Sequence, residues 1–108
     1  ILSLPEYDSH FEHRKVNNIS KALLRGVSVG LITYRTPSTL EQWIPNYYTE
    51  LQDKEMETKI DILREGFNSQ KDKLYFQRQR IKDFHINYQC SKVGVSYVEQ
   101  FKIERLFG

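Results

Sequence analysis

The chain has 108 residues, of which 39% are hydrophobic and 28% are charged. This balance argues against wholesale disorder, which requires low hydrophobicity together with a high net charge. The formal net charge of +2 is close to neutral and by itself indicates no class of partner. The length suits one domain with a modest core, so we expect a single globular domain over residues 1–108.

Cysteine usage and hydropathy narrow the class of protein further. The single cysteine, Cys90, excludes an internal disulfide framework and is typical of a reducing compartment. The longest apolar run, from Val27 to Ile32, is far too short to span a membrane, and no signal peptide is visible. We therefore expect an intracellular protein of the cytoplasm or an organelle matrix, without a membrane span. The chain begins with Ile1 and not Met, so we interpret it as a fragment or a processed chain.

Charge is unevenly distributed along the chain. Residues 41–65 carry seven acidic and three basic residues, whereas residues 69–92 carry six basic and two acidic ones. These neighbouring segments therefore have opposite net charges of −4 and +4. They are expected either to pack side by side or to orient a charged partner.

The first half of the chain predicts a helix, a strand and a second, shorter helix. Ser9-His-Phe-Glu12 has the form of a capping box, and near-helical apolar spacing follows it, which predicts a helix over residues 9–25. The β-branched and apolar residues 27–34 predict a buried strand. A second capping box at Ser38-Thr-Leu-Glu41 predicts a short helix that Pro45 interrupts.

The second half predicts two helical segments, then a strand and a closing helix. Residues 46–65 carry an apolar stripe opposite their acids, which predicts the longest helix. Residues 70–82 fit either a helix or a strand, and we favour a helix. Strict alternation over residues 84–90 predicts a half-buried strand, and a third capping box from Ser96 predicts a closing helix. The expected fold class is therefore α+β, a small, mostly helical domain with about two β-strands.

No residue pattern indicates a catalytic, cofactor or metal site. His10 and His13 share one helical face, but zinc needs three or four ligands, so two exposed polar residues are the favoured interpretation. The thiol of Cys90 has no histidine on its own face, because His85 lies five residues away on an alternating strand, so we expect a core thiol. We therefore expect that the protein is not an enzyme.

Residues 71–82 combine basic and aromatic side chains. Single-stranded nucleic acid is held by cations on its phosphates and by rings that stack on its bases, so this stretch is a candidate RNA-binding segment. The alternative is a solvated basic helix face whose aromatic rings turn inward. The candidate RNA-binding residues are Lys73, Tyr75, Arg78, Arg80 and Lys82.

The preferred functional hypothesis is a non-catalytic subunit or adaptor that docks into a larger protein complex or a homo-oligomer. Aromatic residues and arginine dominate the energetics of protein interfaces, and aromatics cluster around Pro45. The predicted docking surface consists of Trp43, Tyr47 and Tyr48. The alternative is a small RNA-binding protein that uses residues 71–82.

Overall fold

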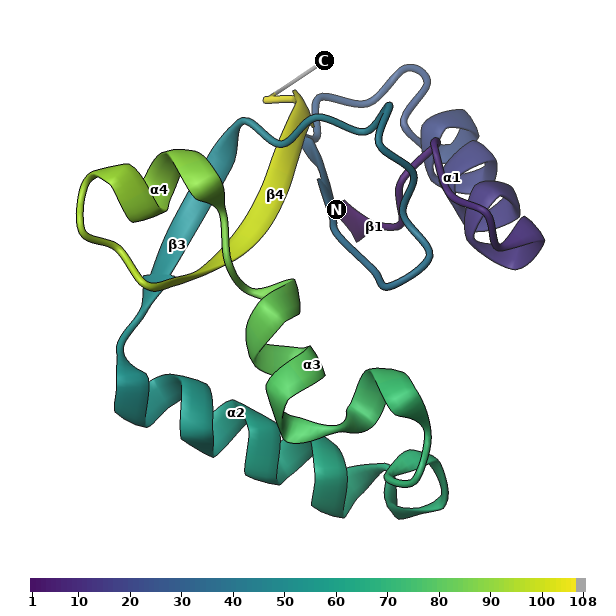
Figure 1. Ribbon diagram of the computed structural model, residues 1–108. Coiled ribbons are helices and arrows are strands. Elements are labelled where there is room, and N and C mark those ends of the chain that lie inside the picture. Colours follow the sequence, from purple (N-terminus) through teal and green to yellow (C-terminus); the bar gives the residue numbers. More distant parts are fainter. Residues whose placement is uncertain (107–108) are drawn as a thin grey trace. The chain divides into compact units, whose positions relative to one another are not determined.

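The computed structural model describes residues 1–106 and contains, within them, four α-helices, two short 3-10 helices and four strands (Figure 1). The elements in chain order are β1 (Leu2–Ser3), α1 (Phe11–Leu23), β2 (Leu31–Tyr34), β3 (Tyr47–Leu51), α2 (Asp53–Gly66), η1 (Asn68–Gln70), η2 (Leu74–Phe76), α3 (Arg78–Phe84), α4 (Tyr88–Lys92) and β4 (Tyr97–Arg105).

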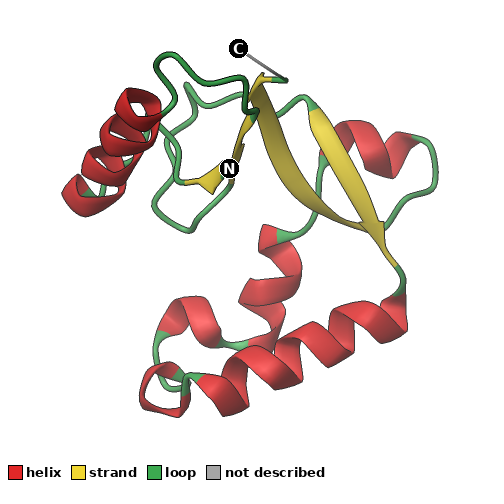
Figure 2. Ribbon diagram, turned by 180° about the vertical axis from the view of Figure 1, so that it is seen from behind, coloured by secondary structure: helices red, strands yellow, loops and turns green. Residues whose placement is uncertain are grey.

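The strands form one mixed sheet in the order β1-β2-β4-β3 (Figure 2). Strands β1 and β2 are parallel, with Leu2 opposite Ile32. Strands β2 and β4 are antiparallel, with Tyr34 opposite Phe101 and a register shift just after Leu31. Most of the pairing therefore joins segments that are far apart in the sequence.

The chain divides into two compact units. The first unit comprises residues 1–48 together with the segment from Gln100 onward, and the second unit comprises residues 49–99. Both boundaries fall inside a strand, one within β3 and the other within β4. A single domain over residues 1–108 stays a prediction.

The first unit has a small core in which polar side chains are prominent. Leu24, Leu31 and Trp43 are buried there, together with Thr33 and Asn17. Because buried polar groups need hydrogen-bond partners, this unit depends on specific polar contacts as well as on apolar burial.

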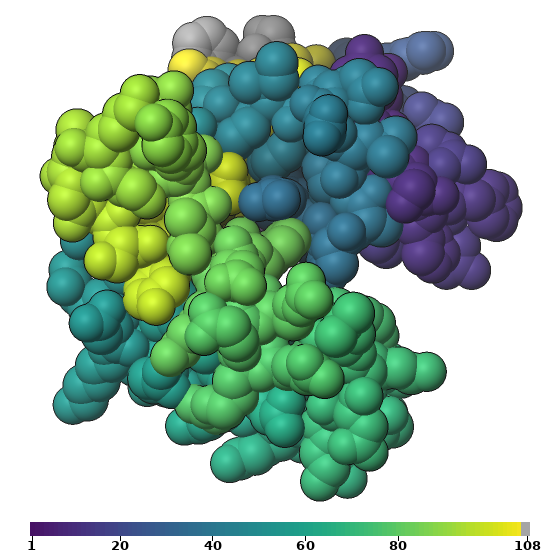
Figure 3. All heavy atoms as spheres, in the orientation of Figure 1, coloured from purple at the N-terminus to yellow at the C-terminus, as the bar shows by residue number. Residues whose placement is uncertain are grey.

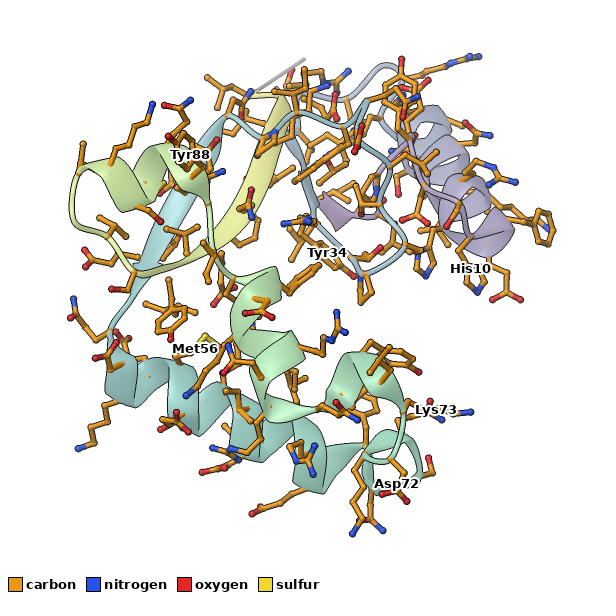
Figure 4. All side chains as sticks on the ribbon, in the orientation of Figure 1. His10, Tyr34, Met56, Asp72, Lys73 and Tyr88 are labelled. Carbon is orange, nitrogen blue, oxygen red and sulfur yellow. The ribbon has the colours of Figure 1, made fainter. Side chains whose placement is uncertain are left out.

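The second unit has a more conventional apolar core. Met56 and Ile60 of α2 are fully buried with Leu51 and with Ile81 of α3. Met56 projects from α2 toward the inside of this unit (Figure 4). Leu63 and two aromatic side chains pack against the cluster, so helix α2 presents its apolar stripe inward as its sequence predicts.

The expectation of a mostly helical domain with about two strands is wrong. The predicted closing helix after Ser96 is instead β4, whose pairing with β2 supplies the backbone partners that a helix would have supplied. The start of the predicted long helix is β3, and α2 begins only at Asp53, where Gln52 and Glu55 form the true capping box. Both segments contain aromatic or β-branched residues, which strands accommodate well, and pairing within the sheet decides between strand and helix.

Other predicted elements also need correction. The predicted strand over residues 84–90 is the end of α3 followed by α4, because the side chain of Asn87 accepts hydrogen bonds from two backbone N–H groups and starts a helix. Residues 38–45 form turns and no helix. Strand β2 covers only the end of the predicted strand, and the helix predicted over 70–82 is reduced to η2 and the start of α3. The first helix is confirmed as α1, although His10 and not Ser9 caps it.

Candidate functional site

The apolar side of α1 faces solvent. Phe11, Val16, Ile19 and Leu23 are between 41% and 68% exposed. At 3.6 residues per turn these four side chains lie within about 140° of the helix circumference, and together they are called the apolar face of α1 below. A surface helix normally turns such a stripe toward the core, but on α1 these apolar side chains are exposed. Figure 3 shows the purple atoms of the N-terminal part of the chain, which includes α1, at the surface.

The polar side of α1 is turned inward and is held by hydrogen bonds. Asn17 and Ser20 are buried, at 0% and 8% exposed. The Nδ2 of Asn17 donates to the carbonyl oxygen of Leu4 at 2.8 Å, and the hydroxyls of Ser20 and Ser3 lie 2.8 Å apart. Polar contacts with the segment around β1 therefore set the orientation of the helix and leave its apolar face uncovered.

Positive charge flanks the apolar face of α1. The Nζ of Lys15 lies 5.9 Å from the ring centroid of Phe11. Lys15 and Arg25 are both exposed, and neither has an acidic partner within residues 1–106. Lys21, in contrast, pairs with Glu6 at 2.8 Å. Glu12 is also exposed on this side of the helix, so the apolar face carries two cations and one carboxylate without ion pairs among residues 1–106.

A buried carboxylate holds the N-terminal end of α1. The carboxyl group of Asp8 is fully buried and accepts hydrogen bonds from the backbone N–H of His10 at 2.8 Å and from Thr36 Oγ1 at 2.9 Å. Burial raises the pKa of Asp8, but the hydrogen bonds from Ser38, His10, His13 and Thr36 outweigh it and lower the pKa from 3.8 to about 2. This ionised group ties α1 to residues 36–39.

Asp8, His13 and Ser38 resemble a hydrolytic triad in composition but not in geometry. In such a triad, serine and aspartate bind opposite nitrogens of the histidine ring. Here the same nitrogen, Nδ1 of His13, lies 3.1 Å from Asp8 Oδ2 and 3.2 Å from Ser38 Oγ. The Ser38 hydroxyl also donates directly to Asp8. The cluster is therefore a structural clamp, because the ring cannot pass a proton from serine while aspartate orients it.

The histidine and cysteine candidates do not assemble into a metal site. The rings of His10 and His13 stack with centroids 4.4 Å apart, and His10 lies at the start of α1 (Figure 4). No group of three or more His, Cys, Asp or Glu side chains among the described residues is placed to hold a metal ion. Cys90 is half-buried on α4, outside the buried core in which we expected it.

The predicted docking residues separate into one core residue and two surface residues. Trp43 is 4% exposed, so its indole belongs to the core of the first unit and is unavailable to a partner. The expectation failed here because a buried hydroxyl, Thr33 Oγ1, accepts the indole N–H at 2.9 Å. Tyr47 and Tyr48 are exposed, and the ring of Tyr47 lies 6.3 Å from that of Phe101.

Two of the predicted RNA-binding cations are engaged in ion pairs between α2 and α3. The guanidinium of Arg78 donates to Asp61 at 2.8 Å and also to Glu57. The Nζ of Lys82 lies 2.7 Å from Glu57. Part of the opposite charge of the acidic and basic segments is therefore neutralised between α2 and α3.

The other three predicted RNA-binding residues are dispersed. Arg80 lies about 200° around α3 from Arg78, since successive helical residues are 100° apart. The hydroxyl of Tyr75 donates to Gln70 at 2.7 Å. Lys73 projects from the loop before η2 (Figure 4), and neither Lys73 nor Arg80 has an ion pair among the described residues. The five residues do not form one continuous basic face.

Sequence reasoning missed the apolar face of α1 as a surface. The spacing of its apolar residues predicts a helix, and such a stripe usually faces the core. The only contrary signal was on the opposite side of the helix, where Asn17 and Ser20 are small polar residues suited to hydrogen bonding with a neighbouring backbone.

Comparison of the chain with known protein families, curated proteins and solved structures found no match. Within the part of the chain that the structure describes, no helix is both long and apolar enough to cross a membrane.

Proposed function

We propose that this chain is a non-catalytic docking module that binds a partner protein through the apolar face of α1. The observation that carries the proposal is the inverted burial of this helix, with Phe11, Val16, Ile19 and Leu23 exposed while Asn17 and Ser20 are buried. Exposed apolar patches of this kind are typical of interaction surfaces.

The spacing of the face supports recognition in a groove. Val16, Ile19 and Leu23 stand at positions i, i+3 and i+7, which is the anchor pattern of helices that lie in an apolar groove. Burial of one such side chain contributes about 1.5–3 kcal/mol. Because the Asp8 cluster and the Asn17 bonds already hold α1 in place, binding does not include the entropic cost of ordering the helix.

The charges around the face indicate the chemistry of the partner. Lys15 and Arg25 flank the apolar side chains without an acidic partner among residues 1–106. Complementary charges increase association rates and select against wrong partners. The partner is therefore a protein with an apolar groove bordered by Asp or Glu.

Site-specific photo-cross-linking tests this proposal. A photoreactive amino acid replaces Ile19 in one sample and Val93, an exposed apolar residue of the second unit, in the matched control. After irradiation in native extract, we expect one protein to be cross-linked from position 19 and absent from position 93. That protein is then purified, and its affinity is measured for the unmodified chain and for variants.

The affinity measurements decide the outcome. The double variant I19S/L23S is expected to weaken binding at least tenfold, because it removes two buried anchors, whereas V93S leaves binding unchanged. Equal binding by all three chains contradicts the proposal. Cross-linking only to second copies of the chain, or co-sedimentation of the chain with anionic vesicles in place of a protein cross-link, also overturns it.

A further inference from the structure

The second unit carries an open pocket with mostly apolar walls. The pocket has a volume of about 480 Å³, and its apolar lining includes Leu51, Ile62 and Leu63. Four charged side chains also line it, and two of them, Lys59 of α2 and Glu99 of β4, come from elements far apart in the sequence. The pocket is unrelated to the apolar face of α1, which belongs to the first unit.

The amine of Lys59 is held between a buried histidine and a carboxylate. Its Nζ lies 2.7 Å from Nε2 of His85 and 3.7 Å from Glu99. The other ring nitrogen of His85, Nδ1, lies 2.7 Å from the carbonyl oxygen of Ile81. A carbonyl oxygen can only accept, so Nδ1 carries a hydrogen and Nε2 is left as the acceptor for the lysine N–H. His85 is therefore placed as a base beside the amine.

The surroundings of Lys59 lower the pKa of its amine. Burial lowers the pKa of Lys59, and the nearby carboxylate of Glu99 opposes this effect only in part. The charged or titratable groups that share its surroundings are Lys54 and Glu55 of α2, His85 after α3, and Glu99 of β4. A lower pKa increases the fraction of the neutral amine, which is the form of lysine that acts as a nucleophile.

We propose that Lys59 is a covalent modification site for aldehydes that carry an apolar tail. The walls of the pocket bind the tail, and the amine nitrogen of Lys59 attacks the carbonyl carbon. A carbon–nitrogen bond forms and the carbonyl π electrons move to oxygen. His85 Nε2 then takes one proton from the attacking nitrogen and passes it to that oxygen. The nitrogen lone pair then expels the hydroxyl, which leaves as water with the second N–H proton. The product is an imine, and no oxidant or reductant is required.

An aldehyde fits this pocket better than a carboxylate does. An anionic ligand would approach within a few ångströms of Glu99, whose carboxylate lies 3.7 Å from the Lys59 amine nitrogen, and would be repelled by it. A carbonyl compound is uncharged, so it does not compete with the carboxylate. The mostly apolar lining indicates a ligand with a hydrocarbon tail.

Reductive trapping tests the proposal. The whole chain is incubated with octanal or with acetaldehyde in the presence of cyanoborohydride, which converts each imine into a stable secondary amine. The modified lysines are then identified and their rates compared by peptide mass spectrometry. With octanal, Lys59 is expected to react about tenfold faster than the exposed Lys73, which corresponds to burial of about two methylene groups. With acetaldehyde this preference is expected to shrink.

Two variants complete the test. Lys59→Arg keeps the charge and the stem but cannot form an imine, so fast labelling is expected to disappear. Lys54→Arg, on the same helix and at the same pocket, is the matched control and retains it. Labelling of Lys59 no faster than Lys73, or a preference that is the same for both aldehydes, overturns the proposal. Neither result bears on docking by α1, so the two proposals fail independently.

Discussion

The indole nitrogen of Trp43 donates a hydrogen bond of 2.9 Å to the hydroxyl of Thr33, and both side chains are buried. The same hydroxyl donates to Glu104 of β4 at 3.2 Å. Trp43 lies in the turn-rich segment after β2, so this pair of bonds joins that segment to strands β2 and β4. It also explains why a tryptophan expected at an interface is a core residue.

Replacement of Trp43 by phenylalanine is expected to destabilise the protein. The change removes the N–H donor from a buried hydroxyl and leaves a gap, with a total cost of about 1–3 kcal/mol in the free energy of unfolding. Urea unfolding followed by circular dichroism measures the change. Tyr47→Phe is the control, because Tyr47 is exposed, and it should change the free energy by less than about 0.5 kcal/mol. Equal effects would show that the indole bond contributes nothing.

Acid is expected to destabilise the first unit through Asp8. Its pKa is lowered from 3.8 to about 2 in the folded state, so the folded protein binds the proton less readily than the unfolded chain does. The resulting stabilisation is fully present above about pH 4 and is lost as the pH falls through about 2. Its size is about 2 kcal/mol at neutral pH.

The variant Asp8→Asn isolates this contribution. It is expected to be less stable than the natural chain at neutral pH, with the difference shrinking as the pH falls from 4 toward 2. Thermal unfolding across that range checks the prediction. A difference that stays constant with pH would show that the Asp8 carboxylate does not titrate as the hydrogen bonds imply.

Gly30 is expected to tolerate no side chain. A methyl group there would lie 2.6 Å from the backbone oxygen of Leu106 and 3.0 Å from that of Arg105. Relief of such a clash requires movement of the backbone, so Gly30→Ala should destabilise the protein by about 1–3 kcal/mol. Gly66→Ala is the control, because nothing lies within 4 Å of the added atom and alanine favours the end of α2. In urea unfolding, the free energy of unfolding should fall for Gly30→Ala and should rise for Gly66→Ala.

RNA binding through residues 71–82 stays a prediction. The ion pairs of Arg78 predict which substitutions should affect it most. If the chain binds single-stranded RNA, Arg80→Ala and Lys73→Ala should each weaken binding and reduce the slope of log affinity against log salt by about one unit. Arg78→Ala should change the slope less, because Asp61 and Glu57 already neutralise that guanidinium. Fluorescence anisotropy with a short labelled RNA at several salt concentrations measures the slopes. Undetectable binding at low salt would remove the RNA hypothesis.

The sequence by itself determined the two long helices, α1 and α2, because the pattern that predicts each helix lies within its own short segment. The apolar spacing is present within the helix sequence, and α1 forms close to its predicted bounds. The apolar stripe of α2 likewise predicted Met56 and Ile60 as inward-facing residues. These features depend on contacts between residues a few positions apart, which is the range that periodicity reports.

Tertiary structure alone decided β3, β4 and the orientation of α1. The segment after Ser96 contains a capping motif, but pairing of Phe101 with Tyr34 commits it to a strand. Hydrogen bonds from Asn17 and Ser20 to residues near the N-terminus turn the polar side of α1 inward, and so expose its apolar face. The Lys59 pocket likewise joins α2 to residues on other elements. In each case the deciding partner is distant in the sequence, and composition and spacing carry no record of which distant segments will meet.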